Sequence, residues 1–379
     1  MAIEPLTHLG KLPIADFMRR YWQRKPLLVR QALPGFAAPI ERERLFELAR
    51  RDDVESRLVT SFLGWRLQRG PLHRLPSVRR PRWTLLVQGV DCHDERAAAL
   101  LARFRFVSDA RLDDLMVSYA TDGGGVGPHV DAYDVFLLQA AGRRRWRIGP
   151  CHDPRLRPGL PLAILQRFTP TQEWVLEPGD LLYLPPGVAH EGTAVGHDCI
   201  TCSIGFRAPA WRELVDPWLD TLASRWRPQG RYRDPGAPAT RHPGRLPAAM
   251  IDAAFAELSR LRPRRADAEQ TLLAELTEPK PHIVFEPPRR PLSLAKFIER
   301  AARKGLRLDR RTRMLYAGAR VAVNGEVFDV PVAERRLLYS LADRRALPPA
   351  ALRGCPRAAC ERLWQWCRSG WLHPEGEER

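Results

Sequence analysis

The sequence predicts a mainly β domain of the double-stranded β-helix (jelly-roll) class, followed by an α-helical module and a C-terminal winged-helix domain. Between residues 112 and 207, short apolar runs alternate with turn signals, and no long helix interrupts them. Beyond residue 209 the apolar spacing becomes helical. After a proline-rich linker, further helices surround a hairpin that is signalled by Asn324-Gly325. We therefore predict domains at 1–208, 209–280 and 281–379.

The elements of the β-rich domain follow from local patterns. Residues 13–22 begin with proline and carry apolar side chains at helical spacing, and residues 41–51 form a second amphipathic pattern. Residues 27–29 and 83–90 have the composition of strands, the second of them buried. The jelly roll itself is predicted from six apolar runs, at 115–120, 135–140, 144–148, 174–176, 181–184 and 199–206. Turn formers connect them at Gly142, 177–180 and 196–198.

The segment after residue 209 has three stretches of helical spacing, at 211–226, 248–261 and 266–276, and no cluster of catalytic side chains. We predict a helical dimerisation module there, and hence a homodimer. In the winged-helix segment, residues 357–368 use most positions for apolar side chains, so few polar groups remain to read a nucleic-acid groove. This pattern favours an interaction scaffold, and direct nucleic-acid binding stays open as an alternative.

Composition narrows the class of protein. The 61 lysine and arginine residues exceed the 44 acidic residues, which gives a net charge of +17. Such a charge suits an acidic partner such as RNA or a ribosomal particle, but it also follows from an arginine-rich composition alone. No apolar stretch is long enough to span a bilayer, so no membrane contact is expected. The absence of a secretory signal and the scattered spacing of the seven cysteines predict reduced thiols and a cytoplasmic protein.

A candidate metal site lies within the predicted jelly roll. His129 and Asp131 are two residues apart, so on an extended strand their side chains leave the same face. His190 follows another predicted strand and a Pro-Pro-Gly turn. Two imidazoles and one carboxylate form the facial triad of non-haem Fe(II) oxygenases, which leaves coordination positions open, whereas a structural zinc site closes all four positions and usually uses cysteines. Each half of the pattern is weak by itself; their combination predicts an iron site.

Seven segments carry a resemblance to a known family: 54–59, 83–88, 113–118, 123–134, 142–147, 176–184 and 203–209. Through them the chain resembles the JmjC-type, cupin-like Fe(II)/2-oxoglutarate oxygenases, and among these the bacterial ribosomal oxygenases. The resemblance covers residues 1–210 well, and the order of catalytic, helical and winged-helix parts also fits. It implies a protein hydroxylase that acts on an arginine (3-hydroxylation) of a large-subunit ribosomal protein.

The resemblance also implies cofactors and their ligands. His129, Asp131 and His190 would hold Fe(II), with 2-oxoglutarate as chelating co-substrate and dioxygen as the second substrate. The far carboxylate of 2-oxoglutarate would pair with Ser118 and Arg144, because a buried carboxylate without partners is costly.

Without the resemblance, the sequence does not show which arginine would pair with the far carboxylate of 2-oxoglutarate. Arg143, Arg144 and Arg145 follow one another, and a regular strand turns the first and third to one face and the second to the other. Without the resemblance, any of the three could face the co-substrate.

An arginine substrate would need an acidic or aromatic clamp near the iron. Asp122 and Tyr133 flank the metal motif and are our candidates for substrate binding. Each has an ordinary alternative, since Asp122 could cap the glycine turn and Tyr133 could pack in the core. Further aspartates in this region predict an acidic mouth on an otherwise basic protein, namely Asp109, Asp113, Asp114 and Asp134.

Other functions fit the same sequence. A ribosomal-protein histidine hydroxylase or a JmjC-type demethylase would use the same iron site, because target choice depends on the loops around the metal. A nucleic-acid-binding regulator, with a winged helix and a ligand-sensing cupin, belongs to a different class. The match around 123–134 favours arginine as the target.

Overall fold

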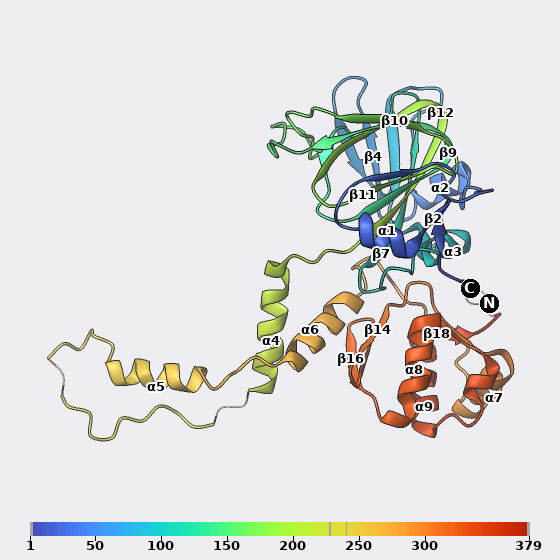
Figure 1. Cartoon of the computed structure of the whole chain (residues 1–379). Helices are drawn as coiled ribbons and strands as arrows, with labels where there is room; N and C mark the ends of the chain where they lie inside the picture. Colours follow the sequence, from blue (N-terminus) through green and yellow to red (C-terminus); the bar gives the residue numbers. More distant parts are fainter. Residues whose placement is uncertain (1–2, 227–228, 240, 377–379) are drawn as a thin grey trace. The chain divides into compact units, whose positions relative to one another are not determined.

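The computed structural model describes residues 3–226, 229–239 and 241–376. Its elements, drawn in Figure 1, form two compact units. The first contains the residues up to Ala208, Pro279–Thr312 and the residues from Arg336 onward, and the second contains Pro209–Glu278 and Arg313–Arg335. The C-terminal segment therefore contributes to both units, and the three-domain division stays a prediction.

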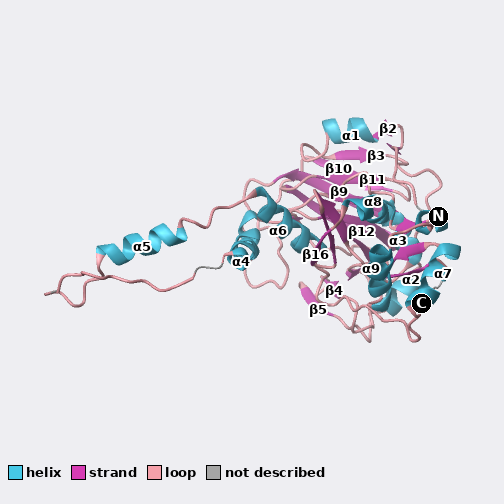
Figure 2. Ribbon diagram, turned by 90° about the horizontal axis from the view of Figure 1, so that it is seen from below, coloured by secondary structure: helices cyan, strands magenta, loops and turns pink. Residues whose placement is uncertain are grey.

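A ten-stranded sheet dominates the first unit and supplies its jelly roll (Figure 2). Its strands follow the order β3-β11-β9-β12-β7-β6-β4-β5, with β10 paired to β9 and β8 paired to β12. The bounds are β3 (Leu27–Val29), β4 (Ser56–Thr60), β5 (Arg66–Arg69), β6 (Trp83–Val87), β7 (Leu112–Ala120), β8 (His129–Val130), β9 (Val135–Pro150), β10 (Gln172–Leu176), β11 (Leu181–Leu184) and β12 (Val188–Phe206). A separate short pair is formed by β1 (His8–Leu9) and β2 (Leu12–Pro13).

The two longest strands correct the sequence prediction. Residues 135–140 and 144–148 belong to the single strand β9, so the turn expected at Gly142 does not end a strand. The turn expected at 196–198 likewise lies inside β12. Both signals fall where the β9–β12 ladder shifts its register, between Val195 and Ile200. A bulge there bends two paired strands without interrupting them, which the local turn residues alone do not reveal.

The core of the jelly roll is apolar and aromatic. All five residues of β6 are buried, as the sequence predicts for a central strand. Phe17 of the first helix packs edge-on against Tyr183 of β11 and lies near Phe136 of β9. These contacts fix the helical N-terminal segment to the strands that carry the candidate site.

The helices of the first unit are α1 (Ile14–Arg20), α2 (Arg42–Leu48), α3 (Glu95–Ala102), α7 (Leu294–Lys304) and α9 (Arg357–Arg368), with short 3-10 turns η1 (Val90–Cys92) and η3 (Pro349–Leu352). Three of these helices, α1, α2 and α9, lie close to the helices predicted at 13–22, 41–51 and 357–368, whereas α3 was not predicted. A three-stranded sheet accompanies the helices, built from β17 (Ala346–Leu347), β13 (Leu306–Leu308) and β18 (Leu372–Pro374). The apolar side chains of α9, including Leu363 and Trp366, are buried in the fold. That burial supports the interpretation of this helix as a packing element.

The second unit combines helices with a small antiparallel sheet. Its elements are η2 (Trp211–Leu214), α4 (Val215–Arg225), α5 (Ala248–Leu258), α6 (Arg265–Thr277), β14 (Met314–Ala317), β15 (Arg320–Val323) and β16 (Glu326–Asp329), and α8 (Val332–Arg344) starts in it. The predicted Asn324-Gly325 hairpin joins β15 to β16. Among the described residues, no helix has both the length and the apolarity needed to cross a membrane.

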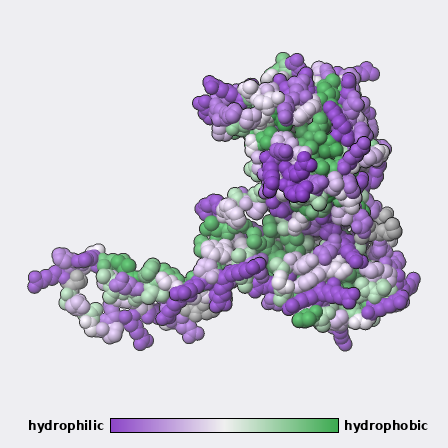
Figure 3. Space-filling model, viewed as in Figure 1, coloured by the Kyte–Doolittle hydropathy of each residue, from purple (hydrophilic) through white to green (hydrophobic). Residues whose placement is uncertain are grey.

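Helix α5 differs from its neighbours because none of its residues is buried. Ile251, Phe255 and Leu258 are exposed to 50%, 72% and 59%, and hydrophobic residues are visible along this part of the surface in Figure 3. An apolar helical face of this kind is typical of a binding surface.

Candidate metal centre and active site

Backbone pairing brings the three predicted metal ligands together. His129 in β8 and His190 in β12 are direct cross-strand partners. Asp131 follows β8 on the same face as His129, and its two carboxylate oxygens lie 3.9 Å from Nε2 of His129 and 3.6 Å from Nε2 of His190. The ligand atoms of all three residues lie within 4.8 Å of one another. The three side chains thus converge on one centre, as a metal site requires.

Hydrogen bonds set the tautomer of both imidazoles. Nδ1 of His129 lies 3.0 Å from the carbonyl oxygen of Gly127, and Nδ1 of His190 lies 3.0 Å from that of Val188. A carbonyl oxygen only accepts, so each Nδ1 carries the proton and donates it. The lone pair of each Nε2 is then free for a metal ion.

The electrostatics of the centre also suit a cation. Burial, together with the charge of His129, lowers the pKa of His190 to about 3, so its ring is neutral near pH 7. Burial raises the pKa of Asp131, against the opposing effect of His129 and Arg57. Metal binding needs unprotonated imidazoles and an ionised carboxylate, and a bound cation favours that state.

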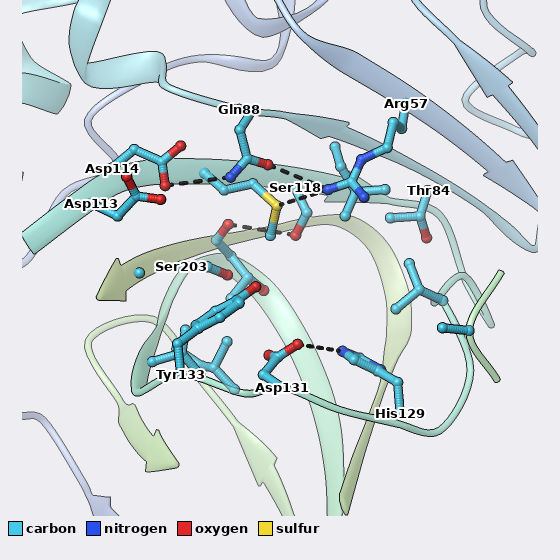
Figure 4. Close-up of a pocket in the computed structure, with 18 of the residues that line it drawn as sticks. Arg57, Thr84, Gln88, Asp113, Asp114, Ser118, His129, Asp131, Tyr133 and Ser203 are labelled. Atoms are coloured by element: carbon cyan, nitrogen blue, oxygen red, sulfur yellow. Dashed lines mark hydrogen bonds and ion pairs between the residues drawn. The ribbon is translucent and has the colours of Figure 1, made fainter. Parts of the chain in front are cut away.

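The centre opens into a cavity of about 350 Å³ between two walls of the jelly roll. Figure 4 shows His129, Asp131 and Tyr133 on one wall. Ser118, Asp113 and Asp114 face them from the other wall, which belongs to the β6–β7 side of the sheet. The cavity can therefore hold a small ligand at the metal and still admit a polar side chain from outside.

One arginine of the three is buried in this cavity. Arg144 is 5% exposed, whereas Arg143 and Arg145 are exposed to solvent on the opposite face of β9. Its Nε and Nη2 atoms have no hydrogen-bond partner among the described residues. Ser118 is also buried, and its hydroxyl makes a long contact of 3.5 Å with the carbonyl oxygen of Thr201. A buried cation without a partner is costly, so this end of the cavity fits an anionic ligand.

Two of the aspartates that were predicted near the site, Asp113 and Asp114, line the same cavity. Asp113 and Asp114 each accept from Nζ of Lys280 at 3.1 Å, and Asp113 also accepts from Nε of Arg207 at 3.0 Å. Burial alone would lower the pKa of Lys280, but the charges of the two aspartates outweigh it and raise the pKa.

The expected acidic mouth is only partly present. Of the predicted aspartates, Asp109 pairs with Arg105, and Asp134 is buried against Arg111 and Tyr183. Neither lines the cavity, and basic residues accompany the aspartates that do: Arg57, Arg144 and Arg207.

Of the two residues predicted to bind the substrate, only Tyr133 lines the cavity. Tyr133 lines the cavity beside the metal centre and is 43% exposed, and burial of its hydroxyl with the nearby charge of Asp131 raises its pKa. Asp122 does not line the cavity; its Oδ1 accepts from the backbone N–H of Gly196 at 2.8 Å. Asp122 therefore contacts β12 at Gly196 rather than the cavity or the glycine turn that follows it in the sequence, and this placement does not support a contact with the substrate.

The sequence did not single out Met116 and Trp146 as residues of the site, although strand periodicity indicates both of them. Asp114, Met116 and Ser118 alternate along β7 and all line the cavity. Trp146 stands two residues after Arg144 in β9 and also lines it. Because side chains two apart share a face of a strand, the implied co-substrate residues already pointed to these neighbours. No comparable signal marks Lys280, which lies far away in the sequence.

Comparison with known proteins agrees with this geometry. A model of the JmjC domain matches residues 99–214, and a model of the ROXA-like winged helix matches residues 260–373. The second match begins before the predicted boundary at residue 281 and includes α6.

Two bacterial relatives match over long stretches. The chain is 35% identical over 338 residues to the "Ribosomal protein uL16 3-hydroxylase" of Escherichia coli (strain K12), covering 88% of this chain and 89% of that protein. It is 38% identical over 206 residues to a "Probable ribosomal oxygenase" of Haemophilus influenzae, covering 53% of this chain and 51% of that protein.

Solved structures match the whole architecture. The X-ray structure of E. coli YcfD superposes with a TM-score of 0.85 at 33% identity, covering 98% of this chain and 100% of that one. A structure of the same E. coli ribosomal oxygenase in complex with cobalt and 2-oxoglutarate superposes with a TM-score of 0.82 at 33% identity, covering 97% and 100%. With its JmjC-type fold and winged helix, the chain belongs to the bacterial ribosomal oxygenase family, alongside the uL16 3-hydroxylase of E. coli.

Proposed function

We propose that this protein is an Fe(II)- and 2-oxoglutarate-dependent hydroxylase that acts on carbon 3 of an arginine in a large-subunit ribosomal protein. The observation that carries the proposal is the convergence of His129, Asp131 and His190 in a cavity that Arg144 also lines, with two guanidinium nitrogens that have no hydrogen-bond partner among the described residues. This donor set is the one that non-haem iron oxygenases use. The names of the relatives and the cobalt and 2-oxoglutarate complex of E. coli YcfD support it.

Each group of residues has a defined task in this proposal. His129, Asp131 and His190 hold the metal through one side of its coordination sphere. Arg144 and Ser118 bind the far carboxylate of 2-oxoglutarate, so the buried guanidinium gains the partner it lacks in the free chain. When bound, iron with 2-oxoglutarate and dioxygen supplies the oxidation of an unactivated C–H bond. The walls of the jelly roll exclude bulk water from that chemistry.

The opposite wall supports a cationic target side chain. Asp113 and Asp114 carry the carboxylates that a guanidinium can bind with paired hydrogen bonds, and Tyr133 adds an aromatic face beside the metal. In the free chain Lys280 pairs with both aspartates. An arginine substrate would share or take over these contacts, whereas a histidine substrate has no comparable use for two carboxylates.

The proposal includes a homodimer and a cytoplasmic site of action. The exposed apolar face of α5 supports self-association, and all seven cysteines are free, as in a reducing compartment. A ribosomal-protein substrate places the enzyme where ribosomes are assembled.

Mass spectrometry of ribosomal proteins from cells with and without the gene tests the function directly. We expect one arginine-containing peptide of a large-subunit protein to lose a single oxygen when the gene is deleted, and to regain it with the wild-type gene. His129→Ala and His190→Ala should fail to restore it and should abolish 2-oxoglutarate decarboxylation, because each removes a metal ligand. Loss of oxygen from a histidine instead would shift the target to the alternative, and full decarboxylation by either variant would refute the metal site.

A further inference from the structure

Two buried hydrogen-bond donors in the candidate cavity have no task in the proposed function. The hydroxyl of Thr84 and the indole Nε1 of Trp146 both lie inside the protein, with their residues 1% and 5% exposed. Neither atom has a hydrogen-bond partner among the described residues. Most buried polar groups in proteins are paired, so two orphaned donors in one cavity call for a ligand that accepts from them.

Trp146 stands between the metal centre and the buried arginine. Its ring centroid lies 5.9 Å from the imidazole centroid of His190, and Cζ of Arg144 lies 5.7 Å from its ring. Across the strand pair it faces Gly192, where an added Cβ would come within 2.7 Å of the indole. The missing side chain of Gly192 thus lets the indole approach β12 closely. The ring is close both to the metal centre and to Arg144, and a ligand that joins the two can contact it.

Thr84 approaches the same space from the other wall. It lies in β6, two residues before Leu86, which pairs with Ser118 of β7. Figure 4 shows Thr84 and Ser118 on the wall that faces His129 and Asp131. Thr84 and Ser118 therefore line the same cavity from neighbouring strands.

We infer that Trp146 and Thr84 are positioning residues for the dicarboxylate co-substrate, each donating a hydrogen bond to one of its oxygens. The inference rests on the proposed function. A bound 2-oxoglutarate presents more acceptor sites than the metal, Arg144 and Ser118 satisfy, because each carboxylate oxygen accepts more than once. The indole N–H and the threonine hydroxyl complete this donor set and hold the acid in one orientation along the line from His190 to Arg144.

Calorimetric titration of 2-oxoglutarate into the full-length chain loaded with Co(II), which supports binding without turnover, tests the inference. Trp146→Phe keeps the ring and removes the N–H; Thr84→Val keeps the shape and removes the hydroxyl. We expect each to weaken 2-oxoglutarate binding about ten-fold or more, as for the loss of a hydrogen bond to a charged group, with Co(II) binding unchanged. Thr84→Ser should restore the affinity.

Trp174→Phe is the matched control, because Trp174 pairs with Trp146 across the β9–β10 ladder and does not line the cavity. Its affinity should equal that of the wild type. Wild-type affinity in Trp146→Phe and Thr84→Val would overturn the inference and leave the proposed function standing, since the donors would then serve only internal water. A wild-type protein that binds Co(II) but not 2-oxoglutarate would overturn both. If Trp146→Phe does not fold, the dissociation constants of Thr84→Val and Thr84→Ser test the inference by themselves.

Discussion

At the residue scale, Arg144 differs from Arg143 and Arg145 because its guanidinium is buried. We expect Arg144→Ala to weaken 2-oxoglutarate binding about 10- to 100-fold, because it removes charge-assisted hydrogen bonds to a carboxylate. The same change should not lower the thermal stability of the ligand-free protein, since it removes a buried charge whose Nε and Nη2 have no hydrogen-bond partner among the described residues.

The exposed neighbour provides the control for this prediction. Arg145→Ala removes the same charge from the opposite face of β9 and should leave the dissociation constant unchanged. Equilibrium binding with Co(II) present, paired with thermal unfolding without ligand, measures both effects. An Arg144→Ala protein that binds 2-oxoglutarate as tightly as the wild type would move the carboxylate partner to another residue.

A second residue-scale prediction concerns acid stability. Burial, reinforced by the charge of Arg51, lowers the pKa of His93 to about 4. The unfolded chain binds a proton at the ordinary histidine pKa near 6.5, so it gains protons before the folded protein does. The stability contributed by neutral His93 is therefore full above pH 6.5 and is lost as the pH falls toward 4.

Replacing His93 should make the free energy of unfolding depend less on pH below pH 7. We expect the wild type to lose about 1–2 kcal/mol more than His93→Gln between pH 7 and pH 4, after allowance for partial solvent screening. Denaturant midpoints followed by tryptophan fluorescence at several pH values measure the difference. His152→Gln, at an exposed position, should follow the wild type. Parallel profiles for wild type and His93→Gln would contradict the assignment.

At the scale of elements, the glycine-rich turn before β8 brings the metal-binding strand into place. A Cβ at Gly124 would lie 2.8 Å from the carbonyl oxygen of Thr121 and still closer to that of Trp83. Both atoms belong to the backbone and cannot move aside like a flexible side chain. We expect Gly124→Ala to destabilise the protein by about 1–3 kcal/mol through this overpacking, seen as a lower denaturant midpoint.

A glycine in open space is the control for this steric argument. Gly244 has no heavy atom within 4 Å of an added Cβ and no left-handed backbone, so Gly244→Ala should be neutral or slightly stabilising. If Gly124→Ala were as stable as the wild type, the close approach of the turn to β6 would not be needed to hold the site.

At the scale of the whole molecule, the exposed apolar face of α5 predicts self-association. Ile251→Glu combined with Phe255→Glu places two charges on that face, and we expect it to shift the molar mass measured by light scattering from dimer to monomer. Leu63→Glu, at another exposed apolar position in the first unit, should leave the mass unchanged. A monomeric wild-type protein at micromolar concentration, or a double variant that stays dimeric, would refute the α5 interface.

The sequence by itself predicted the fold class, the order of the parts and the three side chains that converge in the candidate metal centre. These features depend on local information: alternation in strands, helical spacing, turn residues, and a His-x-Asp pair that shares one face of a strand. The alternation of the three arginines also predicted that the middle one would differ from its neighbours, and only Arg144 is buried.

The tertiary structure alone decided which residues share the cavity. The bulge that keeps β9 and β12 continuous depends on their mutual pairing, and the contact of Lys280 with Asp113 and Asp114 joins residues that lie far apart in the chain. The same holds for Asp122, whose carboxylate accepts from the backbone of β12 at Gly196 although it stands next to the metal motif in the sequence. The physical reason is that sequence neighbours report the direction of a side chain along its own element, whereas the environment of that side chain is set by the elements that pack against it.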